Sequence, residues 1–457
     1  MTTRTAAVTA AVIIHLVVVT SVFLQPLGAG SRPLSDRFLG ARLYHDSARM
    51  NGPGIDFFAV YHAGFNARTG VSIYRTLELS SGRTPYFFDY RYLPIVAMTL
   101  GRAASLLPPL DAYRCWVLLV EALLWVVMLT AFRSLLRRGP GIVAWIALVV
   151  STPYVLELHM GQFTFAAAGL LAIGVWLLER SDLASSAWRG RAAAAVAIAA
   201  ASLLKVFPAV SLVACVRRRR WWGVAAAAGL TIAALTVPLF WERPDDWFNF
   251  LDANHVADPG PGNFGFLYAL FLTIQLFGVP WSAALWSGIV TVGLAVLMGI
   301  AVLVVFGNRR KVFAAEVSLL LLAQALASYQ VWEHHMTGVM VAGGMLLVAM
   351  LDRPAAGGSR GPSRLVPLSA WFVAGSLVLI ALPTPYALFD PNPKFWTAAQ
   401  RMAIQWAKPI PTLVLYACGV AWLLADGAFV PQQLRRYLPS RVAGSTTDRT
   451  TIPTRSS

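Results

Sequence analysis

Long apolar runs recur along the whole chain and decide which elements the sequence predicts. Each run approaches the length of helix that crosses the roughly 30 Å hydrocarbon layer of a bilayer. Because lipid cannot satisfy the hydrogen bonds of an open backbone, such runs must be helices. The runs are residues 5–24, 116–132, 142–155, 163–178, 192–216, 222–239, 283–306, 312–328, 337–351, 368–382 and 411–424. The sequence therefore predicts an all-α, polytopic integral membrane protein with about 11–13 transmembrane helices.

Three apolar stretches fit a full span poorly. Residues 192–216 have arginines at both ends and are long for one span but short for two, so we interpret them as a helical hairpin with its tip at "LLKVFP", residues 203–208. Residues 266–277 are predicted to be an interfacial or re-entrant helix, because a full span there would place the basic "NRRK" segment outside. Residues 93–107 conflict with the same charge rule unless they too cross only part of the bilayer.

Basic residues cluster beside the ends of the apolar runs. The clusters fall at residues 133–138, 180–191, 217–220, 309–311, 353–364 and 435–441. The positive-inside rule assigns all of them to the cytoplasm, together with a short N-terminus that enters a retained first helix. The long loop at 25–90 then lies outside and carries interfacial helices. We expect one membrane domain over residues 1–425 and a disordered cytoplasmic tail over 426–457.

The composition agrees with this topology. Of the 457 residues, 57% are hydrophobic and 13% are charged, well away from the balance of a soluble domain. The net charge of +16 follows the loops and forms no single patch, so nucleic acid is not a predicted partner. The three cysteines lie inside apolar runs without metal-like spacing. The chain has neither a GxxxxGK[ST] phosphate loop nor a GxGxxG turn, which favours a donor already in the membrane over a cytosolic nucleotide.

Polar side chains gather on the external side of the predicted topology. They are Asp56, His62, Glu157, His159, Gln162, Lys205, Asp245, Asp246, Glu333, His334 and His335. Charges in or beside membrane spans are costly, so their common side predicts a buried hydrophilic cavity that opens outward.

Each polar group also has a structural alternative. Asp56 would cap the helix that begins "FFAVYHAG", a role that does not exclude catalysis. Lys205 would extend toward the membrane interface, the histidine pair would be structural, and "ELHMGQF" would be a polar turn. No HExxH motif is present, so a divalent cation would need ligands from distant loops, and no cofactor is predicted.

Several short motifs follow one another in a characteristic order. They are "DFFAVYHAGFNARTGVSIY" from Asp56, "YFFDYRYLP" from Tyr86, "GQFTF" from Gly161, "LLKVFP" with a basic run and "WW", a "PGNFG" loop, and "YQVWEHH" before a span. This order resembles the polyprenyl-phosphate-sugar-dependent membrane glycosyltransferases of the GT-C superfamily. It is most similar to the family of the phosphatidylinositol-mannoside α-(1→2)-mannosyltransferases, glycosyltransferase family 87. The resemblance covers nearly the whole chain.

The resemblance implies a GT-C-like fold and an inverting hexosyltransferase in the cell membrane, active on the extracytoplasmic side. It would pass mannose from a polyprenyl-phosphate donor to a lipid-linked glycan such as a phosphatidylinositol mannoside. An acidic residue of the first external loop serves as base in such enzymes, and Asp56 matches it. The leaving phosphate needs cations or donors, and His334, His335 and Lys205 are the candidates. Candidates for contact with the sugar or the acceptor are Tyr61, His62, Gln162 and Glu333.

Two features depart from the best-known members of that family. "FFDYRYLP" has an arginine where those members commonly have "YPP", and the loop before Asp56 is rich in arginine. The sugar and the acceptor therefore stay open, with arabinofuranosyl transfer as the nearest alternative.

Other classes of membrane protein remain as alternatives. A lipid transporter or flippase would also contain buried charges, but the sequence has no inverted repeat and its polar groups share one side, which favours a one-sided active site. A non-catalytic partner in envelope assembly would have the same fold with Asp56 unused.

Overall fold

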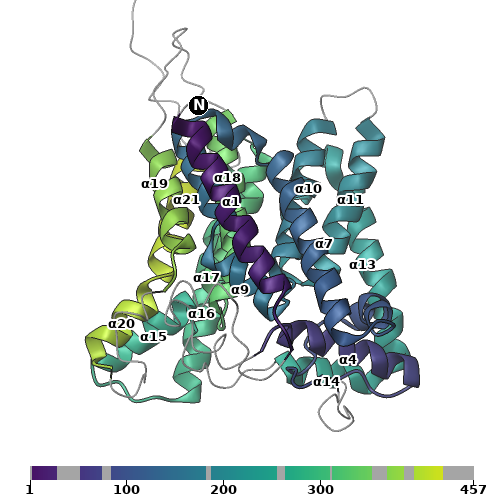
Figure 1. Ribbon diagram of the computed structural model, residues 1–457. Helices are drawn as coiled ribbons and strands as arrows, with labels where there is room; N and C mark the ends of the chain where they lie inside the picture. Colours follow the sequence, from purple (N-terminus) through teal and green to yellow (C-terminus); the bar gives the residue numbers. More distant parts are fainter. Residues whose placement is uncertain are drawn as a thin grey trace, which may run out of the picture.

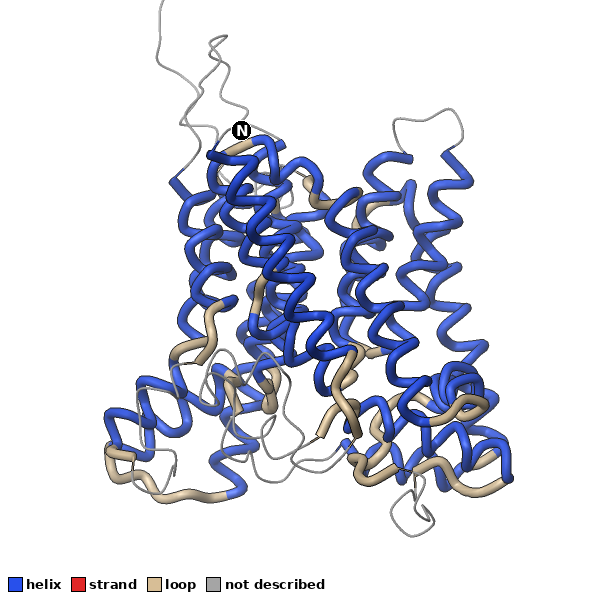
Figure 2. Tube along the Cα trace, viewed as in Figure 1, coloured by secondary structure: helices blue, strands red, loops and turns tan. Residues whose placement is uncertain are grey.

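The computed structural model describes residues 3–27, 52–74, 84–181, 187–254, 263–308, 311–352, 368–384 and 396–425. Every regular element in these ranges is a helix, which confirms the all-α prediction (Figures 1 and 2). The predicted tail at 426–457 and the arginine-rich segment before Asp56 lie outside the described residues.

Eight helical stretches in the described ranges are long and apolar enough to cross a membrane. Their helices are α1 (Thr3–Phe23), α7 (Pro109–Leu129), α8 (Gly139–Val149) with α9 (Thr152–Met160), α10 (Thr164–Ser181), α13 (Trp222–Glu242), α16 (Ala283–Gly307), α18 (Met336–Asp352), and α20 (Ala398–Trp406) with α21 (Pro409–Leu424). Three further helices pack among them: α11 (Ala187–Leu204), α17 (Phe313–Ala327) and α19 (Leu368–Ala381). The eight stretches within the described ranges are fewer than the 11–13 membrane helices predicted, and α17 and α19 are apolar but shorter than a full span.

The two ends of the bundle differ in character. The N-terminus of α1 lies at the upper end in Figure 1, and so do the connection from α7 to α8, the end of α10 and the start of α11. Basic residues of two predicted cytoplasmic clusters lie here: Arg133, Arg137 and Arg138 between α7 and α8, Arg180 in the last turn of α10, and Arg189 and Arg191 near the start of α11. The lower end carries short helices that lie across the bundle, among them α4 (Ile55–Thr69), α14 (Pro244–Asn254), α15 (Phe266–Leu276) and α20.

The run at 192–216 folds back on itself, as predicted. Helix α11 ends at Leu204. Lys205 lies in a short non-helical stretch, and the 3₁₀ turn η3 (Phe207–Val210) and the short helix α12 (Ser211–Val216) follow it. The next helix, α13, packs beside α11. The returning arm is anchored by Glu316 of α17, which is fully buried and accepts hydrogen bonds from Arg217 and Arg218.

The other two irregular runs form only short helices, which agrees with the prediction for 266–277 and removes the ambiguity of a full span at 93–107. Residues 94–104 form three short pieces, α5 (Pro94–Val96), the π-helical η1 (Ala97–Gly101) and α6 (Arg102–Ala104), of which η1 and α6 pack along α4. The approach is so close that a Cβ on Gly64 would lie 1.9 Å from the carbonyl carbon of Gly101. Helix α15 has 11 residues and lies with α20 at the lower end (Figure 1).

Two helices at the lower end were absent from the sequence prediction. Helix α14 occupies a segment that the sequence presented as an external loop, and α20 lies in a stretch without an apolar run. Both are short and mix apolar with charged residues, so neither produces the long hydrophobic signal that marks a span. Such helices suit the interface between lipid and water.

Candidate active site

The site begins where α9 meets α4. Helix α9 ends at Gly161, which has a φ of +67°, and a Cβ there would lie 2.6 Å from the Cβ of Phe57. The Gly54 N–H donates to the His159 carbonyl at 2.7 Å, which joins the start of α4 to the end of α9. Only glycine meets both demands at position 161, namely a left-handed backbone and room for the neighbouring helix. The junction brings Asp56 of α4 next to Gln162.

Asp56 lies in the first turn of α4, one residue after the helix begins. The N-cap position belongs to Gly54, and no side chain caps the helix, so the interpretation of Asp56 as an N-cap is wrong. The carboxylate instead faces Gln162, which donates a hydrogen bond to it. Its Oδ2 is buried and has no hydrogen-bond partner within the described residues.

The surroundings of Asp56 change its acidity. Burial raises the pKa of Asp56 to about 6, and the effect is partly offset by the charge of Lys205, by the hydrogen bond from Gln162 and by the charge of Arg91. A carboxylate with a pKa near 6 is a stronger proton acceptor than an ordinary aspartate and is still largely ionised at neutral pH. Those are the properties of a general base.

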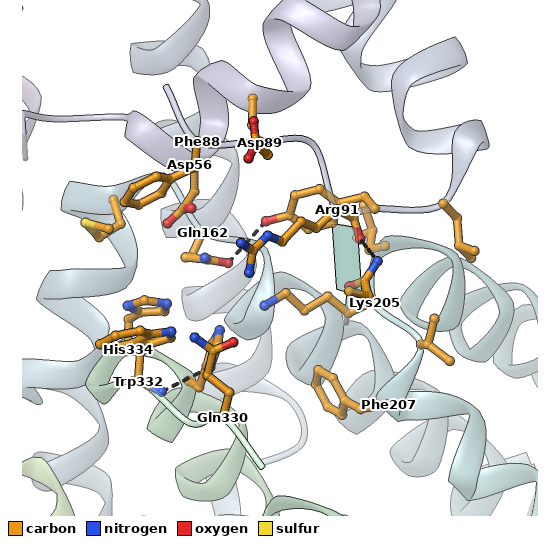
Figure 3. Close-up of a pocket in the computed structure, with 18 of the residues that line it drawn as sticks. Asp56, Phe88, Asp89, Arg91, Gln162, Lys205, Phe207, Gln330, Trp332 and His334 are labelled. Atoms are coloured by element: carbon orange, nitrogen blue, oxygen red, sulfur yellow. Dashed lines mark hydrogen bonds between the residues drawn. The ribbon is translucent and has the colours of Figure 1, made fainter. Parts of the chain in front are cut away.

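A cavity of about 450 Å³ opens beside Asp56 (Figure 3). Its lining includes Asp56, Asp89, Arg91, Tyr92, Gln162, Lys205, Phe207, Asn254, Tyr329, Gln330, Trp332, His334 and His335. A cavity is therefore present where the sequence predicted one, and it unites five of the predicted site residues: Asp56, Gln162, Lys205, His334 and His335. Its lining also includes many apolar side chains, among them Phe88, Leu93 and Phe250, so it is less polar than predicted. A smaller cavity of about 170 Å³ adjoins it and shares Lys205, Phe207, Gln330 and His335.

Lys205 is held inside the bundle. Its Nζ donates to the Thr164 hydroxyl at 2.8 Å, and its charge interacts with those of Glu157 and Asp56. Glu157 is itself fixed, because it accepts hydrogen bonds from the Phe165 N–H at 2.8 Å and from the Thr337 hydroxyl at 2.9 Å. These contacts account for Lys205 without an extension to the membrane interface.

Both histidines of "WEHH" line the cavity. The Nδ1 of His335 accepts a hydrogen bond from the Trp332 N–H at 3.2 Å, so the neutral ring carries its proton on Nε2 and can donate with it. The ring of His334 lies edge-on to that of His335, with centroids 4.4 Å apart. Both His334 and His335 therefore contribute to the cavity wall.

Three predicted contact residues lie outside the cavity lining. The Tyr61 hydroxyl donates to the Leu107 carbonyl at 2.9 Å, and His62 packs on Phe87 with ring centroids 4.3 Å apart. Glu333 is buried and pairs with Lys408 at 3.2 Å, where it joins η5 (Glu333–His335) to the start of α21. A sugar contact by Tyr61, His62 or Glu333 has no support from this geometry.

Much of the cavity wall consists of residues that were not predicted from the sequence. Arg91 and Asp89 were present in the quoted "FFDYRYLP" segment, but Arg91 was noted only as a departure from a pattern. The neighbouring Tyr92 donates to the Gln162 Oε1 at 3.3 Å, which leaves the amide nitrogen of Gln162 to face Asp56. The alternation of tyrosines around Arg91 is the signal that could have revealed an extended wall segment.

The "PGNFG" motif has a structural role. The side chain of Asn263 is buried, donates to the Tyr329 carbonyl at 2.7 Å and accepts from the Val331 N–H at 2.9 Å. It therefore holds the "YQVWE" segment, which supplies Gln330 and Trp332 to the cavity.

For a metal ion, no group of three or more His, Cys, Asp or Glu side chains converges within the described ranges.

The chain matches one known protein family. The model of glycosyltransferase family 87 matches residues 92–328, which is half of the chain. The matched segment contains Gln162, Lys205 and the "PGNFG" loop, while Asp56 precedes it and the histidine pair follows it. No curated protein matches the chain.

Proposed function

Because the chain belongs to glycosyltransferase family 87, we propose that it transfers mannose from a polyprenyl-phosphate donor to a lipid-linked glycan, with Asp56 as the base. The observation that carries the proposal is the position of this carboxylate. Asp56 is held in the first turn of an interfacial helix, with a raised pKa, on the wall of a cavity that also contains Lys205, Arg91 and two histidines. A base and a set of cations facing one space are what glycosyl transfer from a phosphate donor requires.

The reaction requires a proton acceptor for the acceptor hydroxyl and a stabilised leaving phosphate. The acceptor hydroxyl attacks the anomeric carbon while its proton passes to the Asp56 carboxylate. The bond between that carbon and the phosphate oxygen breaks, and its electron pair leaves with the phosphate. The products are the glycoside with an inverted anomeric centre and the polyprenyl phosphate. Attack opposite to the leaving group converts a β-linked donor into an α-glycoside.

The positions of the cations suit the leaving phosphate. As the phosphodiester becomes a monoester its negative charge grows, and preorganised donors stabilise that charge most in a site with little water. Lys205 is fixed by Thr164, and the Nε2 proton of His335 is available for donation. Gln162, oriented by Tyr92, holds Asp56 and is also placed to meet a sugar hydroxyl.

The membrane arrangement supports an extracytoplasmic site. Asp56 lies on α4 at the lower end in Figure 1, opposite to the end where the described basic residues of the clusters at 133–138 and 180–191 lie. A donor anchored in the bilayer by a polyprenol would reach this level without leaving the membrane.

The test is a transfer assay with purified protein in lipid or detergent. Polyprenyl-phosphate mannose and polyprenyl-phosphate arabinose would each be offered with phosphatidylinositol mannosides and other lipid-linked glycans as acceptors. The proposal expects mannose transfer with an α-anomeric product. Transfer of arabinose alone would replace the mannose assignment, and movement of labelled lipid across vesicles without donor consumption would favour a flippase.

A further inference from the structure

The carboxylates in and around the cavity outnumber its cations if Lys205 is the only cation, and such a cavity would repel a phosphate. Lys205 interacts with two carboxylates, Asp56 and the buried Glu157, before any substrate arrives. Asp89 contributes a third carboxylate to the lining. A phosphodiester donor carries one negative charge and its product phosphate carries up to two, so a further cation is needed to hold them.

In the part of the chain that the structure describes, Arg91 is a second cationic side chain with a free end on the cavity wall. It lines the cavity, its side chain is exposed, and within the described residues its guanidinium makes no hydrogen bond or ion pair. Its charge acts on Asp56, but less than the charge of Lys205 does. Figure 3 shows the Arg91 side chain pointing into the space above Lys205, while Asp89 lies farther from Lys205 in the view. A guanidinium offers a planar fork of donors that matches two phosphate oxygens at once.

The backbone around Arg91 is fixed on both sides. The Tyr90 hydroxyl donates to the Leu93 carbonyl at 2.6 Å and accepts from the Ala97 N–H at 3.0 Å. The Tyr92 carbonyl accepts from the Tyr74 hydroxyl at 2.9 Å.

The Arg91 carbonyl is also bound, because it accepts from the Asn254 side chain at 3.2 Å. With its backbone fixed and its side chain unbonded, the arginine is positioned for a ligand in the cavity. A surface arginine without a ligand would not require its backbone to be fixed by these hydrogen bonds.

We propose that Arg91 binds the phosphate of the polyprenyl-phosphate donor and of the polyprenyl-phosphate product, with Lys205 as its partner across the cavity. The proposal rests on the proposed function and deepens it, since it identifies the group that recognises the donor's phosphate. It assigns the histidine pair the secondary role of neutral donors.

The test compares Arg91→Gln, Arg91→Lys and the control Arg102→Gln. Arg102 is an exposed arginine of α6 that does not line the cavity. We expect Arg91→Gln to raise the donor KM and the inhibition constant of polyprenyl phosphate by about tenfold or more, the usual size of a lost charge-assisted bond. Arg91→Lys should recover part of this loss, since the charge returns without the fork, and Arg102→Gln should behave as the parent.

A binding measurement separates this proposal from the proposed function. Polyprenyl phosphate is titrated into the purified parent and variants and followed by tryptophan fluorescence, to which Trp332 in the cavity wall contributes. Weaker binding to Arg91→Gln, with an unfolding temperature like that of the parent, supports the phosphate role whether or not sugar transfer is found. Equal binding by the parent and a folded Arg91→Gln overturns it, even if the parent is an active transferase.

Discussion

At the scale of single residues, Asp56 shows how environment converts a common side chain into a candidate base. Its carboxylate lies in the first turn of α4, where the positive end of the helix dipole favours a negative charge, and yet burial raises its pKa to about 6. The sequence identified the residue but misread its local role, because capping depends on which residue leaves the helical backbone conformation. Gly54 does so here, with a φ of +78°.

The pH dependence of transfer follows from this raised pKa. The base must be ionised to accept a proton, so kcat/KM should be constant above about pH 7 and fall about tenfold per pH unit below the Asp56 pKa of about 6. Removing the nearby charge in Arg91→Gln should shift this acidic limb to higher pH, because that charge lowers the pKa of Asp56. An acidic limb near pH 4 in the parent would mean that Asp56 is not the titrating base.

At the scale of elements, the site depends on how helices end and meet. The apolar pattern predicted the hairpin with its tip at residues 203–208, because charges and a proline mark that boundary in the sequence, but it left the run at 93–107 ambiguous. It could not predict α14, α20 or the contact of α9 with α4, since those depend on short amphipathic segments and on close packing between distant residues. The placement of the buried Tyr61 and Glu333 side chains away from the cavity also depends on such packing.

The junction of α9 and α4 yields a prediction about Gly161. An alanine there would take a left-handed backbone and crowd Phe57, so Gly161→Ala should destabilise the protein by about 2 kcal/mol or more and reduce transfer by displacing Asp56 from Gln162. Thermal unfolding and activity would be measured on the same preparation. The matched control is Gly229→Ala in α13, where a Cβ meets nothing within 4 Å. Equal stability and activity for Gly161→Ala and its control would contradict the role of this junction.

At the scale of the whole molecule, the two ends of the bundle differ in the residues and helices that they carry. The end with the basic connections carries the anchor of Glu316 with Arg217 and Arg218, and the other end carries the interfacial helices and the cavity. Charge patterning predicted this division from the sequence alone, because the positive-inside rule acts on loops and needs no knowledge of packing. The sequence predicted only some of the side chains that line the cavity, and Asp89 and Arg91 were not among them.

The orientation of the bundle is open to a labelling experiment. Thr69 at the end of α4 and Arg219 before α13 are exposed and belong to opposite ends. In right-side-out vesicles, Thr69→Cys should react with a membrane-impermeant maleimide, and Arg219→Cys should react only after permeabilisation. The labelling of the parent's own cysteines gives the baseline. The reverse pattern would place the cavity in the cytoplasm.

The central claim is that Asp56 accepts the proton of the acceptor hydroxyl. The most direct measurement is the rate of sugar transfer from polyprenyl-phosphate mannose by Asp56→Asn beside the parent, at saturating donor and with both proteins shown to be folded by thermal unfolding. Asparagine keeps the size of the side chain but cannot take the proton, so we predict a loss in kcat of about 10²–10⁴-fold with donor binding retained. A folded Asp56→Asn that transfers sugar as fast as the parent would contradict the account.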